Sequence, residues 1–340
     1  PFAIIIMDPI NELIKILIID LNNIFMKSID LDSISGTIPE SLFATFQMTF
    51  AIITPALIIG AFVERIKFSA MLIFISLWML IVYVPVTHWV WGGGILSSWG
   101  TMDFAGGIVV HATAGTAALI TALTLGKRRG FPKSITPPHS PILTMIGAAM
   151  LWVGWFGFNA GSALGANGSA GMAMLVTHIS ASMAAIVWMF IEWKRFGKPS
   201  LIGVVTGMVA GLATVTPASG YIGIPGGLIL GFSGGLLCYL AVDYIRGKLL
   251  IDDSLDVFAV HGVGGILGTL LVAFLATSTF SGLGLPEGQT AMSQFVVQIK
   301  AVILTVIWTS ILTYLILKVT SLIVPLRVDE QEEIEGLDLR

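Results

Sequence analysis

Long runs of apolar residues, separated by short polar segments, make up most of the chain. A helix that crosses the roughly 30 Å hydrocarbon core of a bilayer needs about 20 mostly apolar residues. In the 340-residue chain this criterion predicts nine membrane-spanning helices, of which the sixth is the shortest. They cover approximately residues 41–62, 69–90, 104–126, 142–161, 171–193, 200–216, 224–245, 256–278 and 293–324.

The composition is typical of a polytopic membrane protein with an all-α fold. Hydrophobic residues make up 56% of the chain and charged residues only 11%, whereas a soluble domain has about a quarter charged residues. Basic residues are few and scattered, so nothing indicates nucleic-acid binding. The single cysteine, Cys238, excludes a disulfide framework. Motifs for nucleotides, dinucleotides or catalytic zinc are absent from the sequence, and we therefore expect no cofactor and no enzymatic activity.

Basic residues occur in alternate loops. The loops after the first, third, fifth and seventh spans contain lysine or arginine, and so does the segment after the ninth span. The intervening loops contain neither residue; they are 91–103, 162–170, 217–223 and 279–292. By the positive-inside rule, the basic loops and the C-terminus face the cytoplasm, and the N-terminal stretch lies outside the cell membrane.

The N-terminal stretch, residues 1–40, carries several charged side chains and has no apolar run long enough to cross a bilayer. An extracellular N-terminus normally requires a cleaved signal or an earlier span, and neither is visible. We therefore expect membrane helices to precede this stretch in the complete protein. The predicted organisation is an extracellular stretch (1–40), a transmembrane domain (41–325) and a cytoplasmic tail (326–340).

Glycines at four-residue spacing form three candidate packing ridges. Small residues at this spacing let membrane helices approach closely, since lipid offers no hydrophobic drive toward association. The pattern predicts a rigid bundle that can hold a narrow pore at constant width. The ridges are Gly157, Gly161 and Gly165; Gly203, Gly207 and Gly211; and Gly227, Gly231 and Gly235.

Two histidines, His111 and His261, lie inside predicted spans in similar surroundings, each with small residues one turn later. An ionisable group in a membrane span is costly and commonly marks a transport pathway or a proton relay. Its occurrence in both halves of the chain suggests inverted repeats with a site at their interface. A two-histidine metal centre is the alternative, but neither ring has a carboxylate or thiolate at ligand spacing.

Two aspartates mark the starts of the histidine helices. Asp103 precedes the first on the outer side, and Asp256 precedes the second on the inner side, as an inverted repeat requires. We interpret both as structural N-caps, because a carboxylate accepts hydrogen bonds from the free amides at a helix start. Of the remaining histidines, we expect His178 to be a hydrogen-bonded interior residue, and His88 and His139 to be interfacial or in loops.

Aromatic residues gather at the outer ends of several spans. Phe46 and Phe50 share one face of the first span, Trp91 ends the second, and Phe158 and Ser162 close the fourth. An interfacial aromatic belt accounts for such residues in most membrane proteins. Aromatic faces beside a hydroxyl also suit a small cation, through cation–π attraction and one hydrogen bond.

Several strings resemble the ammonium transporter (Amt/Mep/Rh) family, in particular its bacterial and archaeal Amt branch. They include Phe-Gln-x-x-Phe-Ala (46–51), Val-Trp-Gly-Gly-Gly (90–94), Asp-Phe-Ala-Gly-Gly-x-Val-Val-His (103–111), Gly-Trp-Phe-Gly-Phe-Asn-Ala-Gly-Ser (154–162) and Asp-Val-Phe-Ala-Val-His-Gly (256–262). The resemblance implies eleven spans with the N-terminus outside and the C-terminus inside, inverted repeats, and homotrimers with one pore per subunit. The nine predicted spans match the third to the eleventh.

The resemblance also assigns roles to individual residues. Phe50, Trp91 and Ser162 would form an outer site that recruits ammonium, with Phe46 nearby. Phe50 and Phe158 would form a gate.

Below the gate, His111 and His261 would be paired in a hydrophobic pore that conducts ammonia after ammonium loses a proton. A PII-type signal protein would dock at the cytoplasmic face, where the basic loops 127–133 and 194–198 are compatible with it. The alternative within the same family is an ammonium sensor that signals through such a partner without transport.

Overall fold

The computed structural model describes residues 26–134 and 137–337. Most of the predicted extracellular stretch 1–40 therefore lies outside the described residues. Its last part contains two short strands, β1 (Ile34–Ser35) and β2 (Ile38–Pro39), which pair in antiparallel orientation.

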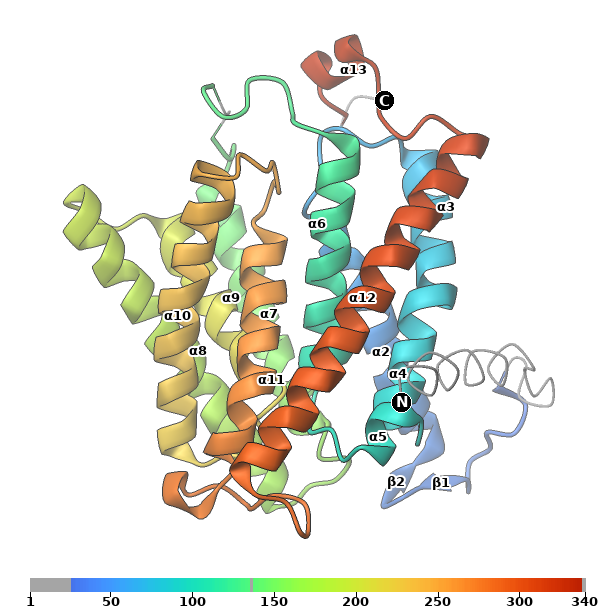
Figure 1. Cartoon of the computed structure of the whole chain (residues 1–340), viewed down its shortest axis with the longest axis vertical. Coiled ribbons are helices and arrows are strands. Elements are labelled where there is room, and N and C mark those ends of the chain that lie inside the picture. Colours follow the sequence, from blue (N-terminus) through green and yellow to red (C-terminus); the bar gives the residue numbers. More distant parts are fainter. Residues whose placement is uncertain (1–25, 135–136, 338–340) are drawn as a thin grey trace.

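A bundle of long apolar helices follows (Figure 1), which confirms the predicted all-helical membrane fold. Within the described residues, eight helical segments are long and apolar enough to cross a membrane. The one remaining predicted span, the sixth, is present as α9, which has only 15 residues and is the shortest span, as the sequence predicted. The helices are α2 (Glu40–Ile59), α3 (Phe68–Trp78) continued by η2 (Met79–Tyr83) and α4 (Val84–Trp91), α5 (Ile95–Ser98), η3 (Gly107–Ala112) continued by α6 (Thr113–Leu125), α7 (Pro141–Gly161), α8 (Gly168–Phe196), α9 (Leu201–Val215), α10 (Ile224–Gly247), η4 (Phe258–Gly262) continued by α11 (Val263–Leu275), η5 (Ser278–Phe280), α12 (Ala291–Ile323) and α13 (Glu330–Glu335).

The two ends of the bundle differ in their contents (Figure 1). The tail helix α13 and the basic loop that follows α6 lie at one end, and β1, β2 and α5 lie at the opposite end. Hydrogen bonds join the tail to that loop, because Glu333 accepts from the backbone amide of Arg129 and Arg327 donates to the carbonyl of Lys127. The structure thus places one basic loop and the tail on the same side, the side predicted to be cytoplasmic.

Helix α8 is held between two of the predicted glycine ridges. On α9, a Cβ added to Gly211 would lie 2.5 Å from the Ser180 carbonyl oxygen, and on α10 a Cβ added to Gly231 would lie at the same distance from the same atom. The Ser180 hydroxyl donates a 2.8 Å hydrogen bond to the Gly211 carbonyl. Both ridges therefore pack as predicted, and the close approach depends on the missing side chains.

The third predicted ridge is wrong for the described residues. A Cβ at Gly157 would meet nothing within 4 Å, while Gly161 faces the ring of Phe46 and Gly165 faces Thr37. The three glycines share a spacing but do not face one partner helix, because α7 ends at Gly161 and Gly165 lies in the following turn.

A single added methyl group tests the α8 contact. We expect Gly211→Ala to lower the thermal stability of the purified protein, because overpacking a tight contact costs about 1–3 kcal/mol. The matched control is Gly171→Ala on α8, where a Cβ would meet nothing within 4 Å and alanine gains up to about 1 kcal/mol in helix propensity. Equal melting temperatures for the two variants would contradict the packing role.

Candidate functional site: a histidine pair below an aromatic cluster

Each of the two intramembrane histidines lies in a π-helical turn at the start of its helix. His111 belongs to η3 and His261 to η4, and both turns continue as regular α-helix. π-Helical turns are rare and often occur at functional sites. Gly106 directly precedes the first of these turns; its φ of 111° suits glycine, and its carbonyl accepts the amide of His111 at 3.0 Å.

The two histidine helices cross at glycine positions. A Cβ on Gly115 would collide with the backbone of Gly262, and one on Gly265 would lie 2.5 Å from the Cβ of His111. The packing is reciprocal, since α11 contacts η3 and α6 contacts η4. This arrangement is what an inverted repeat predicts for its two central helices.

The crossing brings the two rings into direct contact. The Nδ1 atoms of His111 and His261 are 3.2 Å apart, and the ring planes are inclined by only 23°. Both side chains are almost fully buried. For a hydrogen bond between two Nδ1 atoms, one ring must carry the proton and the other must accept it. In the neutral pair, therefore, one Nε2 is an acceptor and the other is a donor.

A cavity of about 390 Å³ lies beside the pair. Its wall is mostly apolar, and the two imidazoles supply its ionisable groups. Trp155 forms part of the wall and stacks on His111, with ring centroids 5.4 Å apart and planes inclined by 22°. The Trp155 Nε1 donates to the Thr216 hydroxyl at 2.9 Å, which holds the indole in place. The remaining lining residues are Ile53, Leu57, Val110, Gly147, Met150, Leu151, Gly154, Phe158 and Val209.

The predicted outer aromatic residues form one cluster at the edge of this cavity. Phe50 lies at its centre, with ring centroids 4.3 Å from Phe158, 5.4 Å from Trp91 and 4.9 Å from Phe46. Phe158 also lines the cavity and stacks on His111 at 6.1 Å. The structure thus brings together aromatic residues from three separate spans, and Phe158 connects them to the histidine pair.

Ser162 is placed one helical turn beyond Phe158. Its hydroxyl donates a 2.9 Å hydrogen bond to the Phe158 carbonyl and is half-buried. The hydroxyl oxygen keeps a lone pair that can accept a further hydrogen bond. Trp91 is oriented from the other side, because its Nε1 donates to the Asp103 carbonyl at 2.8 Å.

Asp103 caps the first histidine helix. Its carboxylate accepts hydrogen bonds of 2.6–3.1 Å from four backbone amides, those of Gly106, Gly107, Ile108 and Val109. Burial raises the pKa of this carboxyl, and the four amides oppose that rise. The cap places a negative charge at the positive end of the helix that carries His111.

The predicted cap at Asp256 is wrong, because Asp253 occupies that role. The Asp253 carboxylate accepts the amide of Phe258 at 2.7 Å, at the first residue of η4. Asp256 instead has a φ of 56° and lies 3.5 Å from the guanidinium of Arg246. The sequence did contain the signal, since Asp253 precedes His261 by the same eight residues that separate Asp103 from His111.

The residue next to this cap joins three segments at the same end of the bundle. The Asp252 carboxylate accepts from Arg65 Nη1 at 2.8 Å and from the backbone amide of Arg128 at 2.7 Å, and Arg65 is completely buried. Burial alone would raise the pKa of Asp252, but Arg128 and Arg65 outweigh it and hold the pKa below its usual value. Arg327 of the tail donates to the Leu125 carbonyl at the end of α6.

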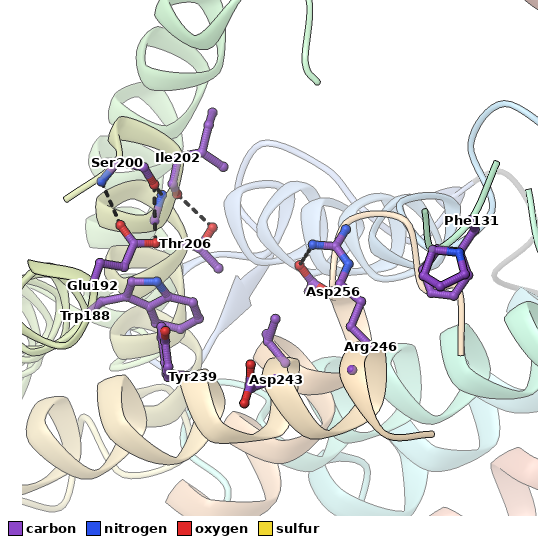
Figure 2. Close-up of a pocket in the computed structure, with 14 residues that line it drawn as sticks. Phe131, Trp188, Glu192, Ser200, Ile202, Thr206, Tyr239, Asp243, Arg246 and Asp256 are labelled. Carbon is purple, nitrogen blue, oxygen red and sulfur yellow. Dashed lines mark hydrogen bonds and ion pairs between the residues drawn. The ribbon is translucent and has the colours of Figure 1, made fainter. Parts of the chain in front are cut away.

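A second cavity, of about 440 Å³, opens near these loops (Figure 2). Trp188 and Tyr239 line it with their rings edge to face at 5.1 Å, and it also contains Glu192, Asp243 and Asp256. The Glu192 carboxylate is already engaged by the Ser200 amide at 2.7 Å. Burial raises the pKa of Asp256 to about 7, with the positive charge of Arg246 opposing that rise.

The other three histidines lie away from the pair. His178 is exposed on α8 and packs against Trp152 at 5.1 Å, so the prediction of an interior residue was wrong for the described chain. His139 is exposed in a loop, as predicted, and His88 lies half-buried near the end of α4. Among the described residues, no third histidine, cysteine or carboxylate joins the His111–His261 pair as a metal-ligand set.

Fold and site together define a multi-pass helical membrane protein whose apolar interior holds a histidine pair below an aromatic cluster. The model of the Ammonium Transporter Family matches residues 14–340, and the chain belongs to this family. This confirms the family resemblance.

Curated relatives and solved structures agree with this assignment. A putative ammonium transporter of Methanothermobacter thermautotrophicus is 49% identical over 308 residues, which cover 89% of this chain and 74% of the relative. An ammonium transporter of Aquifex aeolicus is 48% identical, over 87% of this chain and 69% of the relative.

Among solved structures, a protein described as a Sensor Amt Protein has a TM-score of 0.82 and 31% identity, over 87% of this chain and 76% of that one. Mep2 of Saccharomyces cerevisiae has a TM-score of 0.76 and 36% identity, over 87% and 70% of the two chains.

The raised pKa of Asp256 gives a testable pH dependence. The folded state keeps a proton on this carboxyl up to about pH 7, whereas the carboxyl of an unfolded chain loses it near its ordinary value of 3.8. The contribution of Asp256 to the free energy of unfolding therefore falls as the pH rises between these two values, and it is constant above pH 7. We expect the melting temperature of Asp256→Asn, relative to the parent, to increase from pH 5 to pH 7 and then level off. If the difference in melting temperature between Asp256→Asn and the parent did not vary with pH, the raised pKa of Asp256 would be contradicted.

Proposed function

We propose that this protein transports ammonium across the cell membrane, and that ammonium loses a proton at the outer side before neutral ammonia passes the histidine pair. The curated relatives are named ammonium transporters, which supports the substrate. The observation that carries the mechanism is the His111–His261 contact inside an otherwise apolar cavity.

The apolar wall favours a neutral cargo. Moving a bare cation from water into an apolar cavity costs far more free energy than moving a small neutral molecule. Ammonium can lower this cost by losing a proton, and potassium of similar size cannot. A narrow apolar passage therefore selects for a cation that can be deprotonated.

The aromatic cluster suits the cation before this step. The faces of Phe50 and Trp91 attract a cation by about 0.5–2 kcal/mol each, depending on how far it is desolvated, and the Ser162 oxygen offers one hydrogen-bond acceptor. Phe46 packs edge to face on Phe50 and supports its orientation.

The rings of Phe50 and Phe158 form the gate in this proposal. With centroids 4.3 Å apart they are in direct contact, so passage between them requires a side-chain rotation. Such rotations are fast compared with transport by a carrier that changes its global conformation.

The histidine pair suits ammonia because of its tautomers. Ammonia has three N–H donors and one lone pair, and the pair offers one Nε2 acceptor and one Nε2–H donor. These contacts replace part of the hydration that ammonia loses in the cavity. They also require both rings, since the Nδ1–Nδ1 hydrogen bond determines which Nε2 carries the proton.

The proposal also includes a subunit assembly and a cytoplasmic partner. We infer a homotrimer with one pore per subunit, which is consistent with the exposed apolar surface of α7. A PII-type signal protein would bind at the end that contains loop 127–133, loop 194–198 and the docked tail. A non-transporting sensor is the competing function, and uptake in a host without its own ammonium carriers separates the two.

The histidine pair is tested by removing both rings. We expect His111→Ala combined with His261→Ala, in the complete protein, to reduce methylammonium uptake by tenfold or more, because ammonia then meets no polar group in the cavity. His139→Ala, in an exposed loop, is the control and should leave uptake unchanged. If the double variant took up methylammonium normally and still excluded potassium, the role assigned to the rings would be wrong.

The outer site is tested by Trp91→Leu, which removes one aromatic face. We expect the substrate concentration at half-maximal uptake to rise by roughly two- to tenfold, the equivalent of one cation–π contact, with little change in the amount of assembled protein. Trp193→Leu, an exposed tryptophan on α8, serves as the control. An unchanged concentration dependence in Trp91→Leu would exclude the indole from the site.

A further inference from the structure

Helix α12 carries two glutamines in the part of the bundle that is shielded from lipid. Gln294 and Gln298 lie one turn apart and are fully buried. A buried amide costs free energy unless its donors and acceptor find partners. In a membrane helix such a residue therefore indicates a specific polar contact.

The side-chain amide of Gln298 forms hydrogen bonds to the backbone of one residue of the outer loop through both its oxygen and its nitrogen. Its Oε1 accepts from the Met102 amide at 2.9 Å, and its Nε2 donates to the Met102 carbonyl at 2.7 Å. The same Nε2 donates to the Thr269 carbonyl on α11 at 2.8 Å. One side chain thus joins the outer loop to the helix that continues from η4 and His261.

Gln294 extends this clamp by one turn. Its Nε2 donates to the Gly100 carbonyl at 2.9 Å and to the Gln298 Oε1 at 3.1 Å. The second contact holds the Gln298 amide in the orientation that its own bonds require. Residues 100–102 are therefore bound to α12 at two backbone positions.

The clamped segment leads directly into the entry site. Met102 precedes Asp103, whose carbonyl accepts the indole N–H of Trp91 and whose carboxylate caps η3. On the other side, the Thr269 hydroxyl lies 2.7 Å from where a Cβ on Gly107 would be. A shift of Met102 would consequently move both the acceptor of Trp91 and the start of the helix that carries His111.

Helix α12, which carries both glutamines, packs against both histidine helices. It crosses the bundle diagonally in Figure 1 and contacts α6 and α11, which continue from the histidine segments η3 and η4. Farther along the same helix, Thr320 is also fully buried, but its hydroxyl donates only to the Ile316 carbonyl of its own helix. Burial of a polar side chain on α12 therefore does not by itself produce a contact with the entry segment.

We propose that Gln298 is a positioning residue for substrate entry: by clamping Met102 to α11, it holds Trp91 over Phe50 and so determines the apparent affinity for the cation. The inference rests on the proposed ammonium transport. A residue that only stabilised the bundle would alter the amount of folded protein, whereas a positioning residue alters the concentration dependence of uptake per folded molecule.

The experiment compares Gln298→Met, which keeps the length of the side chain and removes its hydrogen bonds, with Thr320→Val in the complete protein. We expect Gln298→Met to raise the methylammonium concentration at half-maximal uptake by roughly three- to tenfold, the equivalent of about one lost hydrogen bond. Thr320→Val should leave it unchanged. If Gln298→Met fails to assemble, Gln294→Met replaces it in the experiment. This variant loses the hydrogen bonds from Gln294 to the Gly100 carbonyl and to Gln298. It should raise the concentration at half-maximal uptake by a smaller factor.

A double-mutant cycle with Trp91→Leu separates the proposed route from an independent effect. If Gln298 acts through Trp91, Gln298→Met should change half-saturation little once the indole is gone, so the two effects will not be additive. Additive effects, or an unchanged half-saturation in a parent protein that transports, would overturn the inference.

Hydrogen exchange provides a readout that does not depend on transport. We expect faster amide exchange in residues 100–109 of Gln298→Met than in Thr320→Val. A parent without uptake would contradict the proposed function, and the exchange result would then decide alone: unchanged exchange overturns the clamp, and faster exchange supports it.

Discussion

The site depends on the close crossing of two helices at glycine positions. Gly115 lies against the backbone of Gly262, and Gly265 against His111, at the point where the two histidine segments meet. A Cβ on Gly115 would collide with the backbone of Gly262, so larger residues would push the helices apart and break the 3.2 Å contact between the Nδ1 atoms. Without this hydrogen bond, the two rings would no longer be held in the tautomers that give the pair one Nε2 donor and one Nε2 acceptor. Because the rings are buried in an apolar cavity, they have few alternative partners.

A buried carboxylate holds the start of each histidine helix, one at each end of the bundle. Asp103 and Asp253 cap the two segments from opposite sides of the bundle, and each carboxylate is buried. A buried carboxylate is stable only when donors surround it, so each cap prescribes the path of the backbone around it. Gln298 continues this anchoring at the outer end, and Asp252 joins the loop after α6 to the start of η4 at the other end. The entry cluster and the histidine pair are thus parts of one connected frame.

Much of the frame could be predicted from the sequence, because lipid imposes strict rules on it. A membrane helix must be long and apolar, and a close crossing needs small residues, so the spans and the ridges at Gly203–Gly211 and Gly227–Gly235 were recognisable. The errors occurred where one spacing fits several geometries. Asp256 lies near a helix start but turns toward Arg246, and Gly157 has the spacing of a ridge without a partner. His178 was expected inside the bundle, and helical periodicity alone could not indicate which face of α8 is covered.

By itself the sequence determined the membrane class, the approximate spans, the alternation of basic loops and the residue types available for chemistry. Each of these follows from local composition, because each span must be long and apolar enough to cross the bilayer. Only the tertiary structure decided that His111 contacts His261, that Trp155 stacks on the pair, that Asp253 is the second cap and that Gln298 binds Met102. These contacts join residues far apart in the chain, and the π-helical turns shift the register of the side chains in a way that no regular helical period predicts.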